Sequence, residues 1–101
     1  MIESISERSQ IIKEAVAIAT GVGIPDFMVG NDQQKQQMAR RLAVDLYVCN
    51  LGFMGKWWIG RQLGYKFESV NLSGIGFNKA EPEVYDKAQA LYDQMVKEAK
   101  Q

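Results

Sequence analysis

Positive charge in this chain gathers in one stretch that also carries hydroxyl and amide side chains. The 101 residues have no net charge, because 12 basic residues balance 12 acidic ones. Residues 51–80 nevertheless hold four basic residues and one acidic residue (+3), whereas residues 1–50 sum to −1 and residues 81–101 to −2. Lysine and arginine neutralise phosphates, and serine and asparagine can hydrogen-bond to base edges. This stretch therefore has the side chains that contact with a nucleic acid requires.

The spacing of apolar residues and glycine in the same stretch predicts a helix followed by a tight turn. Ile59 and Leu63 lie four residues apart, on one face of a helix, and Gly64 can take the left-handed conformation that ends it. A second short helix over residues 68–78 can then leave at a steep angle. We interpret residues 55–78 as a helix-turn-helix, although an ordinary helix closed by glycine also fits the first part of the pattern.

The absence of histidine and the single cysteine, Cys49, limit the chemistry that the chain can perform. Histidine is the commonest metal ligand and general base, so zinc sites and Ser-His-Asp catalysis are excluded. We expect no enzyme activity, no metal and no cofactor, because no nucleophile-base pair stands out. Without a histidine to activate it, Cys49 is expected to be a small buried apolar side chain.

The hydropathy of the chain gives no sign of a membrane. No apolar run approaches the roughly 18 residues that span a bilayer. The N-terminal residues lack the charged and then apolar pattern of a secretory signal. Net neutrality also gives no electrostatic reason to expect an anionic membrane as a partner. We therefore expect a cytoplasmic protein.

Helical periodicity runs through the whole chain. Ser4 and Glu7 fit a capping box, which predicts a helix to about Thr20 that Gly21 ends. A long helix is expected from a cap at Asn31 or Asp32 to about residue 50, and a last helix from a first-turn proline at residue 82. No segment alternates with a period of two. The sequence therefore predicts one all-α domain over residues 1–101, with five to six helices.

The apolar stripes of these helices predict a shared core. Its expected members are Ile59, Leu63, Leu42, Leu46 and Leu91, because each lies on the inward stripe of its segment. The long helix has apolar residues over a wide arc and should be central.

Two adjacent tryptophans cannot both join that core. Trp57 and Trp58 point about 100° apart on a helix, so at least one of them should be partly exposed. Both side chains could lie at the border of the core. Alternatively, an exposed tryptophan could anchor a protein interface, with Arg61 four residues after Trp57 extending the patch.

The order of the segments resembles the C-terminal DnaA-box-binding domain of the bacterial replication initiator DnaA, over nearly the whole chain. Two motifs carry the resemblance, Met38-Ala39-Arg40-Arg41-Leu42-Ala43 on the long helix and Ile59-Gly60-Arg61-Gln62-Leu63-Gly64 after it. The resemblance implies a tryptophan-repressor-like helix-turn-helix cluster. It also implies a stand-alone and diverged copy, because the family's ATPase domain has no counterpart here.

The chain departs from the family where the family touches DNA. The basic loop before the long helix is reduced to Lys35, and at the start of the second helix Lys66 and Ser69 match the family in kind whereas Phe67 and Glu68 do not. An acidic side chain near phosphates lowers affinity, so we expect weak duplex binding with little base specificity.

Two glycines fall inside the expected second helix. Gly74 and Gly76 each cost a helix interior about 1 kcal/mol relative to alanine. Three explanations are open. The glycines could let the backbone approach a partner closely, they could reflect a loss of selection for base reading, or they could allow close packing between helices.

Two functional hypotheses follow. The first is a DNA-binding module of a phage or mobile element, since an isolated copy without the ATPase domain is unusual for a housekeeping initiator. Its expected phosphate contacts are Lys35, Lys56, Arg61, Lys66 and Lys79, and its expected base-edge contacts are Ser69, Asn71 and Ser73. The second is a protein-interaction domain that kept the fold and lost DNA recognition, with Trp57 and Arg61 contacting a replication or regulatory protein.

Overall fold

The computed structural model describes residues 4–27, 33–64 and 82–99. Within these ranges every regular element is helical and no strand occurs, which confirms the all-α prediction. The described helices are, in chain order, α1 (Ile5–Thr20), α2 (Ile24–Phe27), α3 (Gln34–Leu51), the 3₁₀ helix η1 (Gly52–Met54), α4 (Lys56–Gln62) and α6 (Pro82–Ala99). The predicted helix over residues 68–78 lies outside the described residues.

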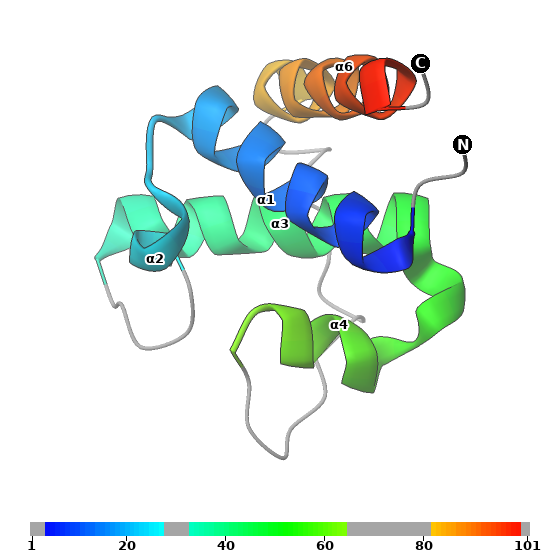
Figure 1. The fold of residues 1–101 in the computed structure, drawn as a ribbon. Helices are drawn as coiled ribbons and strands as arrows, with labels where there is room; N and C mark the ends of the chain where they lie inside the picture. The colour runs from blue at the N-terminus through cyan, green and yellow to red at the C-terminus, as the bar shows by residue number, and fades with distance from the viewer. Residues whose placement is uncertain (1–3, 28–32, 65–81, 100–101) are drawn as a thin grey trace.

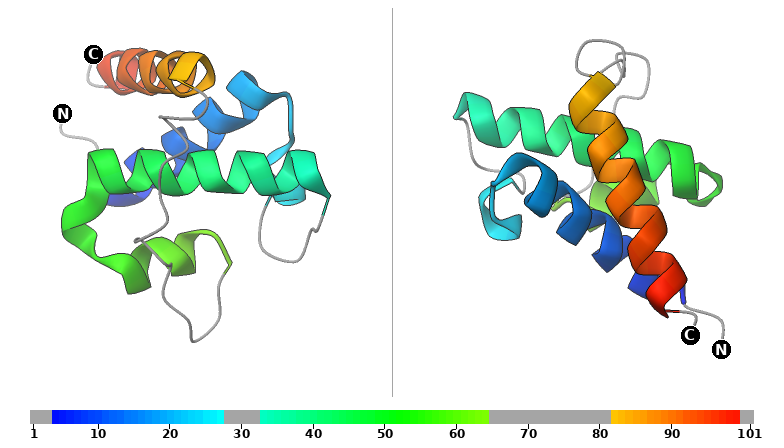
Figure 2. Two further views of the ribbon diagram at one scale, coloured as in Figure 1. Left: turned by 180° about the vertical axis from the view of Figure 1, so that it is seen from behind. Right: turned by 90° about the horizontal axis from the view of Figure 1, so that it is seen from above.

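The helices form three layers around α3 (Figure 1). Helix α1 packs against both α3 and α6, and α4 packs against α3 on the side away from α6. The view from behind gives the same order, with α6 and α4 on opposite sides of the α1–α3 pair (Figure 2). This arrangement leaves one side of α4 free of the other described helices.

Helix α1 begins and ends where the sequence predicts. The side chain of Ser4 accepts a hydrogen bond of 3.1 Å from the backbone N–H of Glu7. At the other end Gly21 has φ 73°, and its N–H donates to the carbonyl of Ala17 at 2.9 Å. Glycine takes this left-handed conformation at little cost, so local sequence defines both ends of the helix.

Helix α3 is the central helix, as its wide apolar arc predicts. Leu42, Leu46, Tyr47 and Leu51 are all fully buried on it. Its cap was predicted wrongly, because the N-cap is Gln33, whose side chain makes no capping hydrogen bond. The helix therefore begins after the two residues that cap best in the sequence, Asn31 and Asp32.

The prediction that Cys49 is buried is wrong. Cys49 is exposed, although Leu42 and Leu46 lie on the same stripe of α3 and are fully buried. The buried face of α3 is centred on Leu46 and Tyr47. Cys49 lies at the border of that face, beside Tyr85 of α6. Burial raises the pKa of Tyr85, and its hydrogen bond with the Cys49 side chain acts in the same direction.

Polar contacts fix α6 on α3 and α1. The side-chain amides of Asn50 and Gln89 donate to each other's oxygens, at 3.0 and 3.1 Å. Arg8 donates from Nε to the hydroxyl of Tyr92 at 2.9 Å, and its guanidinium lies 6.0 Å from the centre of that ring. Pro82 is the first residue of α6, in agreement with the prediction.

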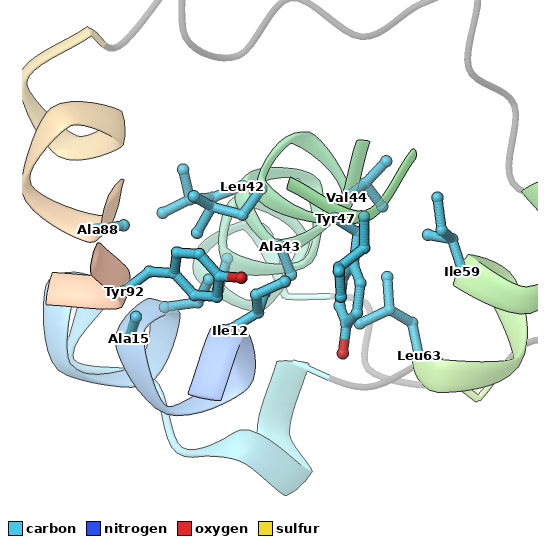
Figure 3. Close-up of a cluster of buried hydrophobic side chains, with 14 of the residues drawn as sticks. Ile12, Ala15, Leu42, Ala43, Val44, Tyr47, Ile59, Leu63, Ala88 and Tyr92 are labelled. Carbon is cyan, nitrogen blue, oxygen red and sulfur yellow. The ribbon is translucent and has the colours of Figure 1, made fainter. Parts of the chain in front are cut away.

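A single apolar cluster joins four helices (Figure 3). Of the five predicted core residues, Leu42, Leu46, Ile59 and Leu63 are fully buried, and Leu91 is partly buried against the same cluster. The cluster also includes Ile12, Ala15 and Val16 from α1 and Ala88, Tyr92 and Val96 from α6. The predicted core is therefore confirmed.

Shortening a central core residue should destabilise the whole domain. We expect Leu46→Ala to lower the free energy of unfolding by roughly 2–5 kcal/mol, because it removes buried methyl groups and leaves a cavity. The control is Ile18→Ala, since Ile18 is exposed on α1; it should change stability by less than about 0.5 kcal/mol. Denaturant melts measure both values, and equal losses would contradict a central position for α3.

Candidate functional site

Helix α4 is held to the core by a buried chain of hydrogen bonds that starts at Tyr47. The hydroxyl of Tyr47 lies 2.6 Å from the hydroxyl of Ser9, which donates to the side-chain oxygen of Gln62 at 2.8 Å. Either hydroxyl can be the donor in the contact between Tyr47 and Ser9. These three residues come from α3, α1 and α4, so the chain of bonds fixes the three helices together.

The environment of Tyr47 keeps its hydroxyl protonated. The hydroxyl of Tyr47 also donates to the backbone carbonyl of Ser9 at 3.0 Å. Burial raises the pKa of Tyr47 to about 12, and the hydrogen bond with the Ser9 side chain opposes only part of that rise. The hydroxyl therefore acts as a structural donor.

Apolar contacts complete the inner side of α4. Ile59 and Leu63 are fully buried and point from α4 toward Tyr47 and Val44 (Figure 3). The ring of Trp58 meets the ring of Tyr47 edge to face, with centroids 5.9 Å apart and planes at 73°. Trp58 is therefore the tryptophan that packs inward.

Two glycines with positive φ bound α4. Gly55, with φ 89°, separates η1 from α4, and Gly64 has φ 86° just after the last turn. The N–H of Gly64 donates to the carbonyl of Arg61 at 3.3 Å, so the helix ends where the sequence predicts. Residues 65–81 lie outside the described residues.

The exposed residues of α4 include two cations and one aromatic ring. Lys56, Trp57 and Arg61 are all exposed, and Trp57 keeps 54% of its surface accessible. This confirms that at least one tryptophan is partly exposed. The sequence has no carboxylate anywhere in residues 46–67, so no acidic side chain of this run neutralises the two cations.

Lys35 lies beside a different element. Its ammonium nitrogen is 4.0 Å from the position that a Cβ atom on Gly21 would take, next to the C-terminal end of α1. A cation is favourable there, because the end of a helix carries partial negative charge. The first turn of α3 lies near α2, whereas α4 follows the opposite end of α3 (Figure 1).

The structure therefore brings together only part of the predicted site. Lys56 and Arg61 share one short helix with Trp57, and Lys35 belongs to another part of the surface. The other predicted contacts lie outside the described residues; they are Lys66, Ser69, Asn71, Ser73 and Lys79.

Two features of the site were missed by sequence reasoning. Ser9 and Tyr47 are 38 residues apart, and no local pattern signals that they meet. The second feature is Phe53, which is 72% exposed. The sequence signal for this exposure was the position of Phe53 between Gly52 and Gly55, because a short segment bounded by glycines has few side chains that could cover a large ring.

Comparison of the chain with known protein families, with curated proteins and with solved structures finds no match. Among the described helices, none combines the length and the apolar character needed to cross a bilayer. The described residues also contain no group of three or more histidine, cysteine or acidic side chains arranged to hold a metal ion.

Removal of one hydroxyl should loosen α4 more than the rest of the domain. We expect Tyr47→Phe to cost about 1–3 kcal/mol, because it leaves polar atoms of Ser9 buried with fewer partners. Hydrogen exchange should show faster exchange in α4. The control is Tyr85→Phe, which removes a half-buried hydroxyl that donates to Gln89 at 3.2 Å and should leave exchange in α4 unchanged.

The same variant reports the raised pKa of Tyr47. From about pH 10 to about pH 12 the unfolded chain loses the phenol proton while the folded chain keeps it, so rising pH favours unfolding. The stabilising contribution is complete below pH 10 and is lost as the pH rises through the folded pKa. Over this interval the free energy of unfolding should fall more steeply with pH for the wild type than for Tyr47→Phe. Parallel curves for the two proteins would contradict the raised pKa of Tyr47.

Proposed function

We propose that the chain is a DNA-binding module in which α4 is the first helix of a helix-turn-helix, organised like the DnaA-box-binding domain. The observation that carries the proposal is the division of α4 into two sides. Its inner side is anchored by Ile59, Gln62 and Leu63, whereas its outer side presents Trp57 and Arg61, and Lys56 is exposed in the first turn. The left-handed glycine that ends α4 also suits a tight turn before a second helix.

The chemistry of such a module is mainly the neutralisation of phosphates. Lys56 and Arg61 would contact the backbone of a duplex, together with Lys35, Lys66 and Lys79, and the base edges would face Ser69, Asn71 and Ser73. Contacts with phosphates position a protein without reading sequence. Because the whole chain is neutral, no long-range field attracts it to DNA, and binding should be weak.

Duplex binding should depend steeply on salt. If the basic residues neutralise three to five phosphates, the slope of log affinity against log salt should be about −3 to −5. Arg61→Ala should make that slope shallower by about one. The control is Lys97→Ala, because Lys97 is exposed on α6, on the opposite side of the molecule. Retardation assays that detect no binding to random duplexes at low salt would refute the proposal.

A second function is favoured by the exposure of Trp57. An aromatic ring that is 54% exposed, one helical turn from an exposed arginine, resembles the anchors that dominate protein interfaces. In this alternative the domain keeps its fold, lacks DNA recognition and binds a replication or regulatory protein through Trp57 and Arg61.

Paired substitutions separate the two functions. In a DNA-binding module, Lys66→Ala weakens binding to all duplexes similarly and makes the salt slope shallower by about one, whereas Trp57→Ala has little effect on duplex binding. In a protein-binding module the order reverses, and Trp57→Ala costs about 2 kcal/mol or more of partner binding. Melting temperatures near wild type must be shown first. Unchanged duplex affinity in Lys66→Ala, with lost partner capture in Trp57→Ala, would establish the second function.

A further inference from the structure

Two aromatic rings stand out from the surface where η1 meets α4. The exposed large hydrophobic residues of the described chain are Ile18, Met38, Phe53 and Trp57. Of these, only Phe53 and Trp57 are aromatic, and they are four residues apart. Phe53 is 72% exposed and Trp57 is 54% exposed. We call this pair the Phe53–Trp57 platform.

The backbone between the two rings is ordered and uncovered. The N–H of Gly55 donates to the carbonyl of Gly52, and the N–H of Ile59 donates to that of Gly55, both at 3.1 Å. A Cβ atom built at Gly52 or Gly55 would meet no neighbouring atom of the described structure within 4 Å. A four-residue separation also keeps the two Cα atoms within about 14 Å of each other. The two rings are therefore close enough along the chain for one extended ligand to span them.

Positive charge surrounds the rings. Lys56 lies between them in sequence, and Arg61 follows Trp57 by one helical turn, with both side chains exposed. Residues 46–67 contain no carboxylate. The charge of the platform is therefore complementary to an anionic ligand that also has flat apolar faces.

The size of the platform favours a nucleic acid over a protein. Full burial of an aromatic side chain covers about 150–250 Å², so the exposed parts of the two rings offer roughly 300 Å². A stable protein interface needs about 800 Å² on each partner, with several apolar side chains at its centre. A base needs only one ring face to stack on, and each stacked base adds to the affinity.

We propose that the Phe53–Trp57 platform binds single-stranded DNA. Unpaired bases would stack on the rings of Phe53 and Trp57, while Lys56 and Arg61 contact the phosphates between them. Duplex DNA cannot use the rings in this way, because its bases are already stacked on each other. The choice of DNA over RNA rests on the proposed function, whereas the stacking itself does not.

The test is the binding of a fluorescein-labelled oligothymidylate of about 12 nucleotides, a length within known single-strand site sizes, to the full chain at low salt. Phe53→Leu and Trp57→Leu keep apolar bulk and remove the aromatic face. Each should weaken binding at least about fivefold, and neither should change the affinity for a duplex of the same length. Trp57→Phe keeps a ring and should retain most of the affinity.

Two controls accompany these variants. Ile18→Ala changes an exposed apolar residue on α1 and should leave oligothymidylate binding unchanged. Tryptophan emission should be quenched on binding in the wild type. That quenching should be largely lost in Trp57→Phe, where the inward-packed Trp58 remains as the reporter.

Several outcomes would overturn the proposal. They are no binding of the oligothymidylate, unchanged affinity in the Phe53→Leu/Trp57→Leu double variant, or tighter binding to a peptide of alternating glutamate and leucine or to phosphatidylserine vesicles. Tighter binding to oligouridylate would overturn the choice of DNA. Failure here is distinct from failure of the duplex function, because the duplex salt slope responds to Arg61 and Lys66 and not to the rings.

Discussion

The buried hydrogen bonds from Tyr47 through Ser9 to Gln62 are the constraint on which the candidate site depends. Helix α4 has seven residues, far fewer than an isolated helix needs for stability in water. It exists because Ile59 and Leu63 are buried and because Gln62 completes a polar chain that includes two other helices. An unsatisfied buried hydroxyl costs about 1–3 kcal/mol, so α4 has little freedom to rotate. The orientation of its outer side follows from that restriction.

Helix α4 and the adjoining η1 carry two kinds of exposed side chain, cations and aromatic rings. The cations Lys56 and Arg61 can neutralise phosphates of either a duplex or a single strand, whereas the rings of Phe53 and Trp57 favour only unpaired bases. The two proposals therefore share their electrostatic part and differ in their aromatic part. A ligand bound through both would compete with duplex DNA for the same two cations.

The opposite side of the molecule serves stability. Helix α6 is attached through the Asn50–Gln89 amide pair and the Arg8–Tyr92 contact, and residues 81–101 carry a net charge of −2. Helix α4 lies across the α1–α3 pair from α6 and carries the exposed cations Lys56 and Arg61.

Local sequence determined what depends on neighbours along the chain. The ends of α1, the end of α4 at Gly64, the start of α6 at Pro82 and most of the core follow from caps, glycines and helical spacing. Only the tertiary structure decided what depends on distant residues. The sequence required at least one partly exposed tryptophan, and the contact with the Tyr47 ring made Trp58 the one that packs inward, partly buried, while Trp57 is exposed. Likewise, Cys49 is exposed and Ser9 is buried because the packing angles of α1, α3 and α6 determine where each buried arc ends, and those angles depend on contacts between residues far apart in the chain.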